Sequence, residues 1–177
     1  MARTNEKFSW PVKAVDPPNL SYGQWQWMAV IGCLFLLMGI LQLISFADFS
    51  NNFAAIGTGS HKWWGALVIL AELWATASFF KLRLSPGFRA VSRFWALAVS
   101  LFWFYNDVRQ LSEGSDLPYF AGGQVHAASA NYFGGFLSQQ PGWWTVIEAI
   151  LFLSAVIYGL NISVSGLRLK VTKRLEG

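Results

Sequence analysis

The sequence predicts an all-α integral membrane protein, a bundle of four transmembrane helices with the N and C termini in the cytoplasm. Of the 177 residues, 54% are hydrophobic and only 12% are charged, whereas a typical soluble domain has roughly 25% charged residues. Four apolar segments approach the roughly 20 residues that a helix needs to cross a bilayer core about 30 Å thick. If these four segments cross the membrane, all but two of the 13 Lys and Arg residues lie on the same side of it. Such a bias marks the cytoplasmic side of a membrane protein.

A polar arm, residues 1–24, precedes the first apolar segment. It is too long for the leader of a signal peptide, and no small-residue cleavage site follows a short apolar stretch, so we expect a cytoplasmic arm. The first helix is predicted over about 25–47 and opens with Trp25, a residue type common at the level of the lipid headgroups. Gly32 and Gly39 within it would allow a neighbouring helix to approach closely.

Residues 48–62 are rich in Asn, Ser and Gly and are predicted to form a loop. The second helix, about 63–80, begins with a Trp pair and ends at a basic turn with Ser-Pro-Gly at its centre. The third helix is predicted over about 90–108. Arg93 near its start would reach the membrane interface with its charged group while its stem stays in apolar surroundings.

The long connection 109–142 is predicted to lie outside the cytoplasm. Its middle is too apolar for a free loop, so we expect a re-entrant or interfacial hairpin, or a surface that docks on a partner. The fourth helix, about 143–164, again opens with a Trp pair, and the basic tail 165–177 returns to the cytoplasm. The transmembrane domain therefore spans residues 25–164.

The positive charges set this topology and the predicted location in a bacterial inner membrane, which the chain would cross several times. Lys62 and Arg109 are the two exceptions on the outer side. The cytoplasmic set comprises Arg3, Lys7, Lys13, Lys81, Arg83, Arg89, Arg93, Arg168, Lys170, Lys173 and Arg174. No cluster of them alternates with exposed aromatic residues, so a nucleic-acid partner is not expected. The single cysteine, Cys33, lies in the first apolar segment and is expected to be a buried thiol.

Glu72 is the one carboxylate within the second apolar segment. A lone ionised carboxylate near the bilayer centre costs about 2.5–3.5 kcal/mol on insertion scales. We therefore expect Glu72 to face the bundle interior, hydrogen-bonded and largely protonated. Its candidate partners are Gln42, Thr76, Ser78, Tyr105 and Asn106. Two roles remain open: a polar residue that holds helices together, or a proton relay or quinone contact.

Deep aromatic side chains form the second candidate site, assigned to a flat ligand or a partner subunit: Trp74, Trp95, Trp103 and Tyr105. They suit a non-covalently bound quinone, carotenoid or chlorin equally well. A third group, Asp107, Arg109 and Glu148, is predicted to form ion pairs that fix the ends of the third and fourth helices. A proton path toward Glu72 is the alternative for this group.

A metal or haem site is not expected. His61 and His126 fall in the predicted outer loops, whereas a membrane haem needs axial histidines on helices within the bilayer. Combining them with Asp48 and Asp116 gives no ligand spacing typical of a metal site. No nucleophile or nucleotide-binding motif is present.

A family resemblance rests on the order of elements in residues 31–108. The first helix ends in a phenylalanine-rich loop, "FADFSNNFAAIG", and the second contains a mid-membrane Glu72-Leu73. A short basic turn, Leu82–Arg93, leads to a third helix rich in Ala and Leu. This order resembles the DoxX/DoxD superfamily of small four-helix membrane proteins. The resemblance implies a small subunit linked to quinone-dependent oxidoreductases, including thiosulfate:quinone types, in which another subunit often holds the catalytic centre.

These features together predict a non-catalytic accessory or structural subunit of a larger bacterial membrane electron-transfer complex, respiratory or photosynthetic. Its expected partners are other membrane subunits and the lipid bilayer. The alternative is a small quinone-linked oxidoreductase subunit, or a proton or solute transporter, that uses Glu72. Whether the protein is an enzyme stays open at this point.

Overall fold

The computed structural model describes residues 15–51, 53, 61–113 and 143–175. Its elements are helices: α1 (Tyr22–Ile44), α2 (Phe46–Asn51), α3 (His61–Thr76), α4 (Pro86–Glu113) and α6 (Trp143–Leu175). The predicted all-helical class is confirmed. Among the described residues, α1 and the first part of α6, Trp143–Ser165, are long and apolar enough to cross a membrane.

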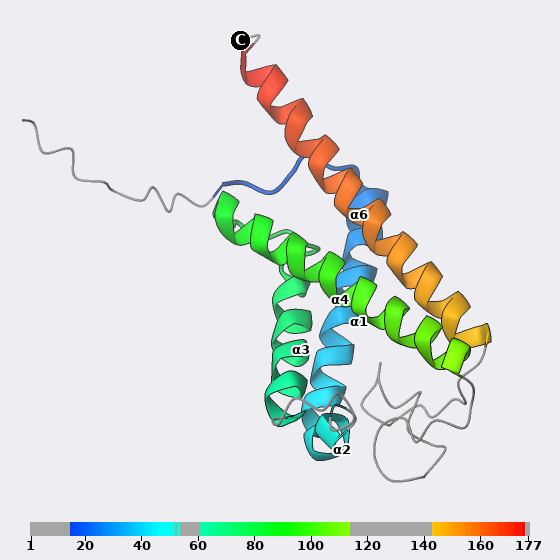
Figure 1. Ribbon diagram of the computed structural model, residues 1–177. Helices are drawn as coiled ribbons and strands as arrows, with labels where there is room; N and C mark the ends of the chain where they lie inside the picture. Colours follow the sequence, from blue (N-terminus) through cyan, green and yellow to red (C-terminus); the bar gives the residue numbers. More distant parts are fainter. Residues whose placement is uncertain (1–14, 52, 54–60, 114–142, 176–177) are drawn as a thin grey trace, which may run out of the picture.

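The four longer helices pack in sequence order. The α1 helix packs on α3, α3 on α4 and α4 on α6, and a smaller contact between α6 and α1 closes the bundle. Figure 1 shows α1 and α3 side by side, with α4 crossing them and α6 returning from the end of α4. We call the end that holds residues 81–85 and the start of α1 the turn end, and the opposite end, marked by α2, the α2 end.

Two helices begin earlier than predicted because of their capping residues. The Ser21 hydroxyl accepts a hydrogen bond from the backbone N–H of Gln24, and the Gln24 side chain accepts one from the backbone of Ser21. This capping box starts α1 at Tyr22. The Ser85 hydroxyl likewise accepts from the N–H of Phe88 at 3.2 Å, so Ser85 caps α4 and Pro86 fills its first position. The Ser-Pro-Gly stretch predicted as a turn is therefore a helix start.

The remaining boundaries differ for local reasons. The α2 helix replaces part of the predicted loop, because Phe49 in it and Phe53 just after it bury their rings at 1% and 3% exposure. The α3 helix ends at Thr76, and residues 77–79 continue as tighter turns with i to i+3 hydrogen bonds. The α6 helix continues to Leu175, through most of the predicted tail.

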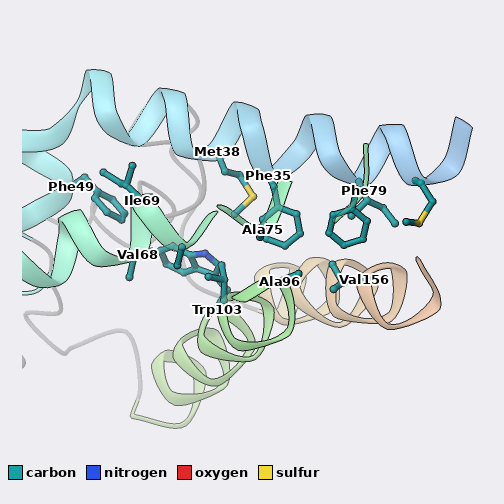
Figure 2. Close-up of a cluster of buried hydrophobic side chains, with 14 of the residues drawn as sticks. Phe35, Met38, Phe49, Val68, Ile69, Ala75, Phe79, Ala96, Trp103 and Val156 are labelled. Atoms are coloured by element: carbon teal, nitrogen blue, oxygen red, sulfur yellow. The ribbon is translucent and has the colours of Figure 1, made fainter. Parts of the chain in front are cut away.

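Gly39 confirms the predicted close helix approach, which joins α1 to α3, whereas Gly32 lies close to the turns that follow α3. A methyl group at Gly32 would lie 3.1 Å from Cβ of Phe79, and one at Gly39 would lie 2.8 Å from Cδ2 of Leu73. Figure 2 shows the buried core between the helices, in which Phe35 and Phe79 lie between α1 and α6. Trp103 lies farther along the core, in contact with Phe49. Cys33, predicted to be buried, is exposed, because it shares the outward face of α1 with exposed apolar residues.

Several contacts join the chain at the turn end. Val15 pairs with Leu84 in an isolated β-bridge, and Asp16 accepts from Arg83 in an exposed ion pair at 2.8 Å. Arg89 is buried and donates to the carbonyl oxygen of Val15 at 3.4 Å. The segment before α1, the basic turn and the start of α4 therefore lie together.

The surface of the bundle is apolar, and its interior contains polar side chains. Exposed large apolar residues cover every long helix, among them Val30, Leu37, Leu43, Leu67, Leu70, Phe94, Leu101, Ile150, Leu151 and Ile157. Buried polar or charged residues include Gln42, Glu72, Ser92, Ser100, Asn106, Asp107, Thr145 and Ser163. Polar side chains are therefore buried beside the apolar core, while many large apolar side chains face outward.

Candidate functional site

Glu72 is the centre of a buried polar cluster that joins three helices. Its side chain is 0% exposed. Its Oε1 accepts a hydrogen bond from Nε2 of Gln42 on α1 at 3.1 Å and another from Nε1 of Trp103 on α4 at 2.9 Å. We call these three residues the Glu72 cluster. The sequence-based expectation that Glu72 faces the interior and is hydrogen-bonded is confirmed.

The close approach of α1 and α3 brings Gln42 to Glu72. A Cβ atom at Gly39 would lie 3.0 Å from Cγ of Leu73 and 3.7 Å from Cβ of Glu72. Gln42 follows Gly39 by about one helical turn, so it lies on the same face of α1. Gly39 therefore allows α1 and α3 to lie close enough for the side chain of Gln42 to reach the carboxyl group of Glu72.

The second carboxyl oxygen has different surroundings. Oε2 of Glu72 is buried and has no hydrogen-bond partner among the residues that the structure describes. An ionised carboxylate is stabilised when hydrogen-bond donors reach both of its oxygens, and a buried charge without such donors is costly. The arrangement, with both donors on one oxygen, fits a neutral carboxylic acid whose proton is on Oε2.

Of the five predicted partners of Glu72, the structure brings Gln42 to it. Thr76 instead donates to the carbonyl oxygen of Leu73 at 2.6 Å, and Tyr105 is 64% exposed. Sequence reasoning did not identify Trp103 as a partner. The available signal was its indole N–H, since a buried tryptophan usually finds a hydrogen-bond acceptor.

The residues predicted to contact a flat ligand lie in different surroundings. Trp74 is 42% exposed and its ring stacks on that of Phe88, with centroids 5.3 Å apart. Trp103 belongs to the Glu72 cluster, whereas Tyr105 points outward. Trp95 alone of the four lines the apolar groove described next. A ligand site formed by these residues stays a prediction.

An apolar groove of about 330 Å³ lies between α3 and α4. Its lining is aromatic and aliphatic: Phe53, Trp64, Leu67, Val68, Ala71, Trp95, Ala98, Val99 and Phe102. None of these side chains titrates, and Glu72 is not among them. The described lining therefore suits an apolar group, and none of these nine side chains is an acid, a base or a metal ligand.

The group predicted to form ion pairs has mixed exposure. Asp107 is buried at 2% exposure, Arg109 is half-buried and Glu148 is exposed. Their pairing stays a prediction. Within the described part of the chain, no three His, Cys, Asp or Glu side chains come together to hold a metal ion. His126 and Asp116 lie outside the described residues.

Comparison with known proteins does not assign the chain to a family. No family model matches it, and no curated protein or solved structure shows significant similarity. The resemblance to the DoxX/DoxD superfamily therefore stays a prediction from residues 31–108.

Proposed function

We propose that this protein is a non-catalytic accessory subunit, embedded in a bacterial inner membrane, of a larger electron-transfer complex of the respiratory or photosynthetic kind. All four long helices would cross the bilayer, with the turn end in the cytoplasm. The basic residues of the turn end would then follow the positive-inside rule. The chain would contact neighbouring subunits through its apolar outer faces and supply no catalytic group.

The observation that supports this proposal is the distribution of apolar and polar side chains. Leu43, Leu70 and Leu151 are 56%, 64% and 64% exposed on three different helices. Large apolar side chains exposed on every long helix are typical of a protein covered by lipid or by other subunits. Because lipid tails are as apolar as leucine, close side-chain packing and hydrogen bonds between buried polar groups would hold such helices together, rather than the removal of apolar surface from water. The Glu72 cluster supplies such groups.

An accessory role is favoured over catalysis by the position of Glu72. Its carboxyl group lies inside the packed core, between Gln42 and Trp103, and not on the wall of the apolar groove. A substrate or quinone in that groove would not meet the carboxyl group in this conformation. The competing function is proton or quinone chemistry at Glu72. It is supported by the Oε2 atom, which has no hydrogen-bond partner among the described residues.

Purification from the native membrane in a mild detergent tests the proposed role. We expect a fixed stoichiometry with redox-active companion subunits, and loss of their assembly when the gene is deleted. A colourless protein that purifies alone, with assembly of membrane electron-transfer complexes unchanged in the deletion strain, would overturn the proposal.

The substitution Glu72→Gln separates the two functions. Glutamine keeps the shape of the side chain and a carbonyl oxygen that can accept from Gln42 and Trp103, but it cannot release a proton. We expect assembly, and electron-transfer turnover of the complex within about twofold of wild type, equivalent to roughly 0.4 kcal/mol in activation free energy. Intact assembly with turnover reduced tenfold or more would instead support chemistry at Glu72.

A further inference from the structure

Two arginines at the turn end of α4 have no carboxylate partner among the described residues. Arg89 and Arg93 are four residues apart, so they share one face of the helix. Arg89 is only 6% exposed, and Arg93 is half-buried. Their positive charges are near enough to repel each other, which is costly in a folded protein unless an anion lies close by. We call these two residues the arginine pair.

The hydrogen bonds of the arginine pair go to neutral acceptors. Nη2 of Arg89 donates to the carbonyl oxygens of Val15 at 3.4 Å and of Leu82 at 3.5 Å, both longer than a typical N–H···O bond. Nη2 of Arg93 donates to the hydroxyl of Ser163 on α6 at 2.7 Å, while its buried Nε has no acceptor among the described residues. A guanidinium has five N–H donors, so these acceptors engage only some of the donors of the pair.

Reaching the membrane interface, the behaviour predicted for Arg93 from sequence, does not by itself explain these surroundings. An arginine that does so extends its guanidinium into water, as Arg83 does in the neighbouring turn, where its side chain is 74% exposed and pairs with Asp16. The arginine pair instead lies against the segment before α1, the basic turn and α6. Figure 1 shows that segment passing the start of α4. The first turn of α4 contains no acid, and its N–H groups add partial positive charge.

The surroundings of the arginine pair fit a phosphate group that carries apolar chains. Arginine suits phosphate because its planar set of N–H donors matches two phosphate oxygens. Val91, between the two arginines in sequence, is 42% exposed, and Phe94, directly after them, is 63% exposed. A phospholipid can contact both the cations and these apolar side chains, whereas free phosphate can contact only the cations. Basic pockets between transmembrane helices on the cytoplasmic side bind anionic lipid head groups in this way.

We propose that Arg89 and Arg93 form a binding site for an anionic phospholipid of the cytoplasmic leaflet, whose phosphate group supplies the counter-charge. The half-buried Arg93 contacts the phosphate, and the more deeply buried Arg89 adds positive charge. The bound lipid stabilises the turn end, where the segment before α1, the start of α4 and α6 lie together. This lipid site rests on the proposed membrane location, with the turn end in the cytoplasm, but not on the accessory role.

Native mass spectrometry of the full-length protein in a neutral detergent tests the site, with phosphatidylglycerol and phosphatidylcholine of identical chains as probes. We expect tighter binding of phosphatidylglycerol. Arg93→Gln should weaken that binding about fivefold or more, equivalent to about 1 kcal/mol for one cation beside an anionic lipid, and should leave phosphatidylcholine binding unchanged. Equal binding of the two lipids by the wild-type protein would overturn the inference. That result is expected if an acid from elsewhere in the chain already neutralises the pair.

Three variants separate the arginine pair from general electrostatic attraction. Lys81→Gln removes an exposed cation from the same end and should keep the affinity for phosphatidylglycerol within about twofold of wild type. Arg93→Lys keeps the charge but loses the planar donor set, so its affinity should lie between those of wild type and Arg93→Gln. Equal losses in Lys81→Gln and Arg93→Gln would contradict a specific site. If Arg93→Gln does not fold, Arg89→Gln, which leaves the bond to Ser163 in place, should show a similar loss.

Thermal unfolding in neutral detergent distinguishes a lipid from a free anion. A ligand that binds the folded state stabilises it, so phosphatidylglycerol should raise the unfolding temperature more than phosphatidylcholine does. Inorganic phosphate should have a smaller effect, because it contacts no apolar side chain. Equal stabilisation by inorganic phosphate would show a site for a free anion and would overturn the assignment to a lipid. Neither measurement depends on co-purification with redox-active subunits, so failure of the lipid site and failure of the proposed function are distinguishable.

Discussion

Trp103→Ala should lower the free energy of unfolding by about 3–5 kcal/mol, the usual cost of truncating a buried aromatic side chain to alanine. Trp103 is 1% exposed and packs against the rings of Phe49 and Phe102. Its loss would leave a large cavity and would also remove one of the two donors on Oε1 of Glu72. Reversible unfolding of the purified protein, for example by titration of SDS into mild-detergent micelles, measures the difference.

Two controls separate packing from hydrogen bonding at this position. Trp103→Phe keeps an aromatic ring but removes the indole N–H, so it should cost about 1–3 kcal/mol, the penalty for leaving a buried polar group less well bonded. Trp63→Ala removes a tryptophan that is 77% exposed and should change stability by less than about 0.5 kcal/mol. Equal effects of Trp103→Ala and Trp63→Ala would contradict the placement of Trp103 in the core.

The inward direction of Glu72 could be predicted from sequence because a carboxyl group in an apolar segment is costly to leave among apolar groups without a hydrogen-bond partner. The helix is therefore expected to turn that face toward polar groups of its neighbours. Gln42 was then a reasonable partner as the one strongly polar residue in the interior of the first apolar segment. The close contact at Gly39 was also predictable, because two helices approach closely where one of them has a very small side chain.

Trp103 shows where sequence reasoning stopped. A tryptophan in an apolar helix suits lipid, ligand, partner and core equally, and only the crossing of α4 over α3 selects among them. The α2 helix was missed because Asn, Ser and Gly favour loops locally, whereas burial of Phe49 and Phe53 is decided by tertiary packing. The start of α4 was a different error, since Ser85-Pro86 is a recognisable helix start that its neighbouring glycine made resemble a turn.

Gly39→Val should destabilise the bundle by about 3 kcal/mol, at the upper end of the cost of overpacking a well-packed core. The added Cβ would lie 2.8 Å from Cδ2 and 3.0 Å from Cγ of Leu73, and the branched side chain has few rotamers with which to avoid them. Either the Leu73 side chain turns away or α1 and α3 separate, and we expect a separation that lengthens or breaks the hydrogen bond between Gln42 and Glu72, because the second valine methyl also points into this contact. SDS titration measures the stability. The infrared carbonyl band of the Glu72 carboxylic acid, assigned as the band that the Glu72→Gln variant lacks, measures the hydrogen bond by its position.

Gly23→Ala is the matched control within the same helix, because nothing lies within 4 Å of the methyl group it would add. Replacing glycine by alanine in a helix normally stabilises by about 0.8–1 kcal/mol, although the gain is smaller in the first turn, where Gly23 lies. Substitutions at Gly23 and Gly39 should therefore change stability in opposite directions. If Gly39→Val proved as stable as wild type with the carbonyl band unshifted, the close contact of α1 with α3 would not be what holds Gln42 against Glu72. The carboxyl group would then owe its position to Trp103 and α4, and the helix spacing at Gly39 would have to be set by other residues.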